Sequence, residues 1–155
     1  MKKKILGIAV AITMLFAIVA LAGCNGGREF RQVEFDGTIV TGHPEEPLLI
    51  RSREQLSAIL DEYGIVWTSG LQRYDNHFFD ENALILYFFG ASGDRAPTFS
   101  VESIKTVGDD TVKLILNRNE LTAGLAFFPI NIVVEVERSI IGNATSIEVE
   151  VKIPS

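Results

Sequence analysis

The run ALILYFF at residues 83–89 constrains the fold more than any other part of the sequence, because it is apolar at every position. Polar residues precede it and Gly90 follows it, so the run is short and bounded by turn-forming residues. Successive side chains of a strand point to opposite faces of a sheet. A strand that is apolar throughout must therefore be covered on both faces. We expect a central strand here, with Tyr87, Phe88 and Phe89 in the core.

Five further segments have the composition of strands. Gly108-Asp109-Asp110 lies between two of them, which predicts a β-hairpin. Gly37 lies within another and predicts a bend in a single strand. Most of these segments alternate apolar and polar side chains, as half-buried strands do. Their residue ranges are 31–41, 98–107, 111–117, 130–138 and 146–153.

One helix is predicted, over SREQLSAILDEYG at residues 52–64. Ser52 can cap its first turn, and Gln55 three residues later completes a capping-box pattern. Gly64 provides the left-handed residue that ends a helix. The apolar stripe has helical spacing and consists of Leu56, Ile59, Leu60 and Tyr63.

Together these elements predict the fold class α+β. We expect a small antiparallel β-rich domain of about six strands with one packed helix. The strand pattern is compatible with a sandwich or with a partly open barrel.

The N-terminal residues 1–23 have the composition of a targeting segment. Lys2, Lys3 and Lys4 precede an uncharged stretch that extends to Ala22. That stretch is long enough to cross a bilayer, which takes about 20 apolar residues. The composition alone is compatible with a membrane anchor that stays in place or with a signal that is removed.

The sequence Leu21-Ala22-Gly23-Cys24 resembles the lipobox of bacterial lipoproteins. The resemblance implies cleavage before Cys24, a lipid on the Cys24 thiol and an acylated N-terminus. It predicts a signal peptide at 1–23, a flexible tether at 24–30 and one β-rich domain at 31–155. The protein would then be lipid-anchored on the extracytoplasmic face of the cell membrane.

Cys24 is the only cysteine, so lipidation leaves the domain without a thiol for a disulfide, a zinc site or a nucleophile. The chain has 14 Lys and Arg residues and 20 Asp and Glu residues. Cleavage removes three lysines, which leaves a net charge of about −9. This charge opposes binding to nucleic acid and to anionic lipid headgroups. We therefore expect contact with the membrane through the lipid alone.

The densest group of polar side chains lies in YDNHFFDEN at residues 74–82. It contains Asp75, His77, Asp80 and Glu81, which are residue types that bind cations or small ligands. Their spacing fits no EF-hand loop and no His-x-x-x-His zinc helix. The favoured interpretation is a connection that buries Phe78 and Phe79, with Asp80 as a candidate cap for a turn. The sequence contains no recognisable catalytic motif, so we predict no enzyme activity and no cofactor.

Residues from about 75 to 138 resemble the C-terminal domain of PrcB-type protease-complex subunits. The resemblance depends on FFDENALILYFF, on the FSVESIKTV and TVKLILN segments and on FFPINIVVEVER, with LSAIL in the preceding helix. It implies a small β-rich fold and a non-catalytic role in binding or stabilising a secreted protease complex. The chain departs from the family at residues 95–99, RAPTF, where the family has a Gly-Gly-Tyr-like turn.

The predicted function is a protein-binding or accessory module at the cell envelope. The candidate contacts lie in the loop at 92–98 and in the aromatic stretch at 125–129, both at strand ends. The residues are Arg95, Pro97, Phe127 and Phe128. The alternative is a lipoprotein that binds a small ligand or a metal through the acidic group at 75–81.

Overall fold

The computed structural model describes residues 29–121 and 123–154, so the predicted signal, Cys24 and most of the tether lie outside the described residues. The helices are α1 (Arg53–Tyr63), α2 (Asn76–Glu81) and α3 (Arg138–Ile141), with a 3-10 turn η1 (Leu71–Arg73). The strands are β1 (Phe30–Val33), β2 (Gly37–Ile39), β3 (Leu48–Ile50), β4 (Ile65–Trp67), β5 (Asn82–Gly93), β6 (Phe99–Val107), β7 (Thr111–Arg118), β8 (Ala126–Glu137) and β9 (Ser146–Lys152).

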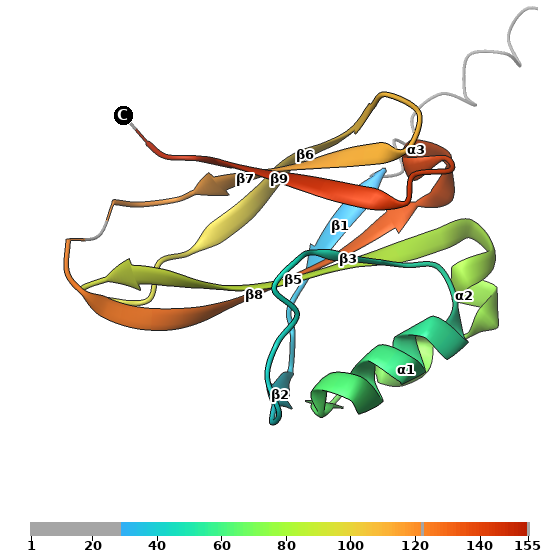
Figure 1. The fold of residues 1–155 in the computed structure, drawn as a ribbon, viewed down its shortest axis with the longest axis horizontal. Helices are drawn as coiled ribbons and strands as arrows, with labels where there is room; N and C mark the ends of the chain where they lie inside the picture. The colour runs from blue at the N-terminus through green and yellow to red at the C-terminus, as the bar shows by residue number, and fades with distance from the viewer. Residues whose placement is uncertain (1–28, 122, 155) are drawn as a thin grey trace, which may run out of the picture.

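The elements form three layers, and the middle layer is a central four-stranded sheet (Figure 1). The central sheet has the strand order β1-β8-β5-β3, and all its pairings are antiparallel. The sheet β6-β7-β9 covers its upper face in the view of Figure 1. Helices α1 and α2 and the small sheet β2-β4 lie below it. The predicted α+β class is confirmed, and the two large sheets form a sandwich that does not close into a barrel.

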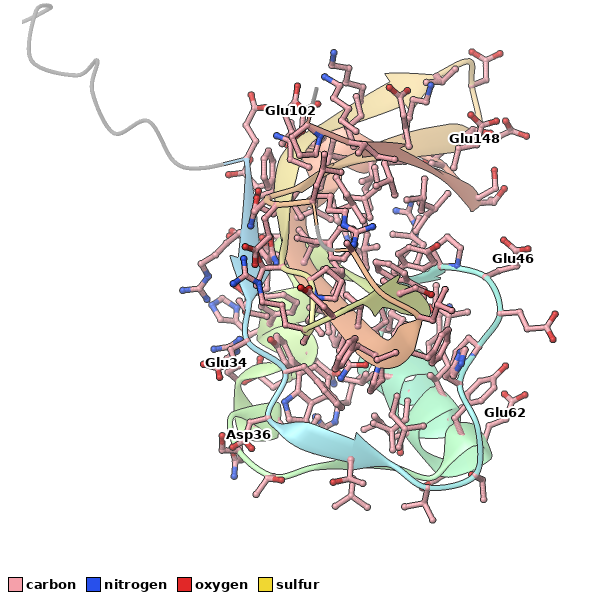
Figure 2. All side chains as sticks on the ribbon, turned by 90° about the vertical axis from the view of Figure 1, so that its left-hand side faces the viewer. Glu34, Asp36, Glu46, Glu62, Glu102 and Glu148 are labelled. Carbon is pink, nitrogen blue, oxygen red and sulfur yellow. The ribbon has the colours of Figure 1, made fainter. Side chains whose placement is uncertain are left out.

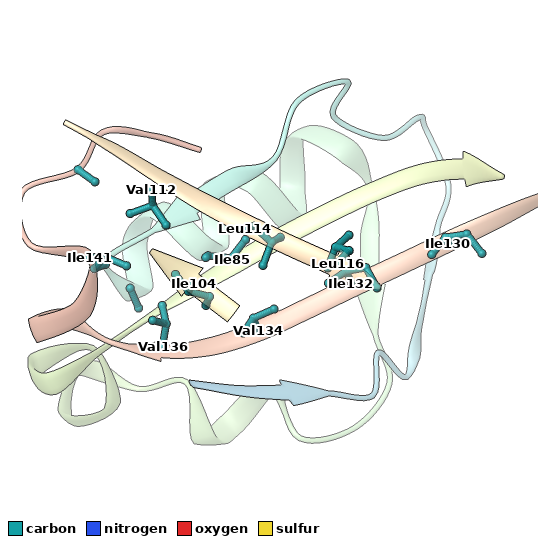
Figure 3. Packing of buried hydrophobic residues seen from close by; sticks show 12 residues of the cluster. Ile85, Ile104, Val112, Leu114, Leu116, Ile130, Ile132, Val134, Val136 and Ile141 are labelled. Atoms are coloured by element: carbon teal, nitrogen blue, oxygen red, sulfur yellow. The ribbon is translucent and has the colours of Figure 1, made fainter. Parts of the chain in front are cut away.

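Strand β5 is the predicted central strand, and it pairs with β8 from Asn82↔Glu137 to Gly93↔Ala126. Its alternate side chains enter two separate cores. Ile85 belongs to the upper core, between the two large sheets (Figure 3). Leu84, Leu86 and Phe88 belong to the lower core, beneath the central sheet. The prediction of burial on both faces is confirmed.

Helix α1 begins and ends where the sequence predicts. Ser52 Oγ accepts a hydrogen bond from the Gln55 backbone N–H at 3.1 Å, and Gly64 adopts a left-handed φ of 60°. Gln55 does not complete the capping box, because its side chain contacts the backbone of Leu49 and Arg51 instead. The buried face of α1 packs into the lower core.

Residues 31–41 form two strands in different sheets rather than the single bent strand predicted. Gly37 begins the second strand, and a Cβ there would lie 2.5 Å from the Val66 carbonyl oxygen and 2.7 Å from Cζ of Phe35. Only glycine lets the chain pass this close to β4. Strands β3 and β4 were not predicted, because each has only three residues and shows no alternation.

The predicted hairpin of β6 and β7 is confirmed, whereas β9 pairs with β7 in parallel. Gln32 joins the two large sheets where β1 passes β6. Its Nε2 donates to the Phe99 carbonyl at 3.2 Å, and its Oε1 accepts from Val101 N–H at 2.8 Å. Arg51 makes a comparable link to the Ala144 carbonyl at 2.6 Å. Within residues 29–121 and 123–154, no helix is long and apolar enough to cross a membrane.

Candidate functional site

The lower face of the central sheet is covered along only part of its length. Helices α1 and α2 and strand β2 lie under one part, and β5 and β8 extend beyond them (Figure 1). We call the covered part the proximal half and the extension the distal half. Phe88 is the last side chain of β5 that is buried in the lower core. Beyond it, Phe127, Pro129 and Asn131 of β8 alternate onto the same face and are exposed.

Phe127 lies directly against the backbone of Gly90 on the neighbouring strand. A Cβ built on Gly90 would lie 1.6 Å from Cζ of the Phe127 ring. The glycine therefore lets the end of the ring lie against the sheet backbone while 71% of the residue stays exposed. The exposed part of the ring is accessible to a partner.

Leu121, Leu125 and Phe127 together form what we call the apolar tip. Leu121 and Leu125 lie in the connection that leads into β8, and they are 63% and 97% exposed. Large apolar side chains that gather at one end of a small domain are typical of an interaction surface. The tip lies at the end of the molecule formed by the start of β8 and the end of β5 (Figure 1).

The four predicted contact residues have different environments. Phe127 and Arg95 are exposed, and Arg95 forms an ion pair with Glu120. Phe128 is half-buried and packs against the upper core. Pro97 is buried, and what remains accessible of it lines a groove beside β8. Alternation explains the difference within the aromatic pair, because neighbouring residues of β8 face opposite sides of the sheet.

A groove of about 600 Å³ runs beside the distal half of β8. Strand β1 pairs with β8 only along Val133–Val136, and the chain then turns away toward β2. The groove occupies the position that a longer β1 would fill. The segments that line it are residues 32–35, 96–99 and 129–132.

Acidic side chains lie around the outline of the domain when it is viewed along its long axis. Figure 2 views the domain from its distal end and shows labelled carboxylates around the outline. Of these six side chains, only Glu102 forms an ion pair in the part of the chain that the structure describes, with Lys152 at 2.6 Å. The six are Glu34, Asp36, Glu46, Glu62, Glu102 and Glu148.

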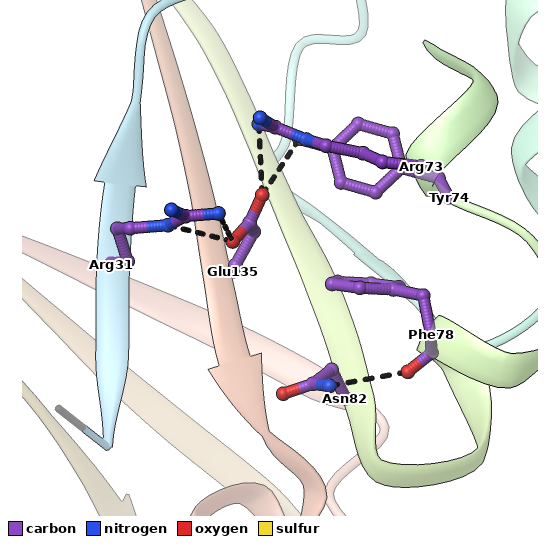
Figure 4. A network of polar contacts seen from close by, with 6 residues as sticks. All are labelled: Arg31, Arg73, Tyr74, Phe78, Asn82 and Glu135. Carbon is purple, nitrogen blue, oxygen red and sulfur yellow. Dashed lines mark hydrogen bonds and ion pairs between the residues drawn. The ribbon is translucent and has the colours of Figure 1, made fainter. Parts of the chain in front are cut away.

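Glu135 is the one buried charged side chain among the described residues, and it lies on the lower face of the proximal half. It forms ion pairs with Arg31 at 2.5 Å and Arg73 at 2.8 Å, and it accepts a hydrogen bond from the Tyr74 hydroxyl at 3.1 Å (Figure 4). Burial raises the pKa of Tyr74 to about 12, although the hydrogen bond from Arg73 opposes that shift. The network links β1, β8 and the η1 turn, and its groups are already paired with one another.

The Glu135 network was not predicted from the sequence. Glu135 follows the alternating pattern of β8, in which polar residues were expected to face solvent. Helix α2 and the η1 turn cover that face, and the carboxylate is buried together with its arginine partners. The sequence also contained a signal for the groove, because Pro129 within a strand is typical of an unpaired edge.

The acidic group at 75–81 does not assemble into a cation site. Asp75 accepts a hydrogen bond from Phe78 N–H at 2.9 Å and caps α2, the role considered for Asp80. His77, Asp80 and Glu81 are exposed on the helix. No group of three His, Cys, Asp or Glu residues in the described parts of the chain could hold a metal ion. Phe79 is buried in the lower core, and Phe78 packs against it, as predicted.

Comparisons with family models, with curated proteins and with solved structures found no match to this chain.

Proposed function

We propose that this protein is a lipid-anchored extracytoplasmic lipoprotein whose domain binds a protein partner through the apolar tip. The observation that carries the proposal is the concentration of exposed Leu121, Leu125 and Phe127 at one end of the domain. We propose a non-catalytic role, since the sequence contains no recognisable catalytic motif.

The position of the tip favours a protein partner over the lipid surface. The Glu29 carbonyl accepts a hydrogen bond from Glu137 N–H at 3.0 Å, so the chain enters beside the C-terminal end of β8. The 12 residues of β8 span roughly 35 Å from there to the tip. Residues 24–29 reach about 17 Å at full extension. An anchor at Cys24 would therefore lie at the opposite end from the tip.

Charge supports the same conclusion. A mature chain of about −9 is repelled by anionic headgroups, which disfavours insertion of the tip into the membrane. The same charge favours a partner with basic residues around its apolar contact. The resemblance to PrcB-type subunits makes a component of a secreted protease complex the partner class we propose.

The binding proposal is tested by photo-crosslinking in intact cells. A photoreactive phenylalanine replaces Phe127 in one strain and Val66, which is 58% exposed on β4, in a control strain. We expect a crosslinked protein adduct from position 127 that position 66 does not give. The absence of an adduct, an adduct with lipid alone, or the same adduct from both positions would refute the proposal.

The anchoring proposal needs a separate test. Cys24→Ala removes the thiol that the lipid would modify, while the domain stays unchanged. We expect the variant to remain unprocessed or to leave the membrane fraction. Normal processing together with retention in membranes would show that anchoring does not depend on Cys24.

A further inference from the structure

The central sheet leaves one strand edge open at the distal half. Strand β5 covers one edge of β8 along its whole length, from Asn82↔Glu137 to Gly93↔Ala126. On the other edge, β1 covers only Val133–Val136. The described residues place no paired strand against residues 126–132 of that edge. An uncovered edge presents backbone N–H and C=O groups that can pair with another extended chain.

Pro129 shows which backbone groups face that edge. It lies opposite Gly90 in the pairing of β5 and β8 and has no N–H to donate. In an antiparallel pair, residues that bond across the ladder alternate with residues whose N–H and C=O point away. Pro129 fits the second kind, so Phe127 and Asn131, two residues to either side, also turn their N–H and C=O groups to the open edge.

The space beside the edge is suited to a strand. The groove of about 600 Å³ has Phe35 and Phe99 in its walls, together with the buried Pro97. Residues 126–132 span roughly 20 Å, which matches an extended peptide of about six or seven residues. The side chains of an added strand would alternate between the exposed lower face beside Phe127 and the side of the upper core.

We propose that the occupant of this groove is an extended, basic and apolar segment of a protein partner, which adds as a strand to the open edge of β8. This inference rests on the proposed function, and it identifies how the partner would be recognised. Backbone pairing supplies the contact along the edge, and alternate apolar side chains extend it to the apolar tip. Glu34 lines the groove and Asp36 lies close in sequence, so lysine or arginine in the segment would complement them.

The test uses the full chain in detergent micelles and a displayed library of random peptides of about ten residues. We expect enrichment of peptides that alternate apolar with basic or polar residues. An enriched peptide is then synthesised, and its affinity is measured by titration against the wild type and two variants at position 131.

Asn131→Pro removes the N–H that faces the open edge. Pro129, two residues earlier, already lacks this group. Asn131→Thr changes the same side chain and keeps the N–H, so it is the matched control. We expect Asn131→Pro to weaken binding about fivefold or more, through one lost hydrogen bond. Asn131→Thr should change affinity less than about twofold. Circular dichroism checks that both variants are folded.

N-methylation of single peptide bonds in the synthetic peptide gives a second readout on the wild-type protein. Strand addition predicts that methylation weakens binding at every second position, because alternate N–H groups face β8. This pattern does not depend on whether the proline variant folds.

Several results would overturn the inference. They are the absence of any enriched peptide from the library, equal binding of the peptide by the two Asn131 variants, and weakening of binding by N-methylation without an alternating pattern. The inference would also be overturned if the wild type forms dimers and Asn131→Pro dissociates them, because the occupant would then be a second copy of the chain. A retained crosslink at Phe127 in any of these cases would leave the proposed function standing.

Discussion

The two halves of the central sheet are built from the same pair of strands, yet their surroundings are opposite. In the proximal half, β5 and β8 lie between the upper and lower cores, with β1 and β3 on the outer edges. In the distal half, no described helix lies beneath the sheet, β1 does not pair with the edge of β8, and Phe127 is exposed. The proximal half therefore contributes side chains to both cores, whereas the distal half leaves Phe127 and one edge of β8 exposed.

Glu135 and Asn131 show the difference on a single strand. Both are polar, and both point to the lower face of β8. Glu135 is buried, and two arginines and a tyrosine compensate for the loss of water around its carboxylate. Asn131 is exposed, and it lines a pocket of about 230 Å³ together with Ile39 at the end of β2 and with Gly42 and His43. The covering layer, rather than the strand, decides the environment of each residue.

The largest expected effect on stability comes from shortening a buried side chain in the proximal half. Leu86→Ala removes a fully buried side chain from the lower core, and we expect the free energy of unfolding to fall by about 3 kcal/mol. Phe127→Ala in the distal half should lower it by less than about 1 kcal/mol. Urea denaturation of both variants measures the two effects. Equal effects would show that the two halves do not differ in stability.

Glu135→Gln is expected to have the next largest effect. It keeps the shape of the side chain and removes the charge that pairs with Arg31 and Arg73. The arginines are partly exposed and can be rehydrated, so we expect a loss of about 1–3 kcal/mol in the free energy of unfolding. Glu148→Gln, on the exposed strand β9, is the control and should have almost no effect. A loss as small as the control's would mean that the network does not stabilise the fold.

Tyr74, in the proximal half, makes the free energy of unfolding depend on pH in the alkaline range. Burial raises its folded-state pKa to about 12, above the ordinary tyrosine value of 10.0. Between these values the unfolded chain loses a proton that the folded protein keeps, so the free energy of unfolding falls as pH rises from about 10 to 12. Tyr74→Phe should reduce this fall, as measured by urea denaturation across that range. The same pH dependence in wild type and variant would rule out Tyr74 as its source.

The smallest expected effect concerns the contact of Gly90 with Phe127. Gly90→Ala places a Cβ in the position of the ring, but the exposed ring can move aside. We expect a loss of about 1 kcal/mol or less in the free energy of unfolding. In a Phe127→Ala background the same change should have no cost, because the ring is gone. A cost that persists in that background would locate the strain elsewhere on β5.

Much of the fold could be predicted from short-range patterns. The apolar run at 83–89 required cover on both faces, Ser52 and Gly64 delimited α1, and a polar glycine turn joined β6 to β7. The residues of the apolar tip were predicted in part: Phe127 was named, Leu125 lies in the predicted stretch at 125–129 without being named, and Leu121 lies outside it. Pro97 was predicted as a contact from its place in a loop at a strand end, and it is buried.

The sequence by itself determined which residues share a face of each strand and where α1 begins and ends. These properties depend on neighbours within a few positions along the chain. The tertiary structure alone decided the split of 31–41 into two sheets, the parallel pairing of β9, the burial of Glu135 and the open edge beside Pro129. Alternation assigns a side chain to a face, but the element that covers that face comes from a distant part of the chain.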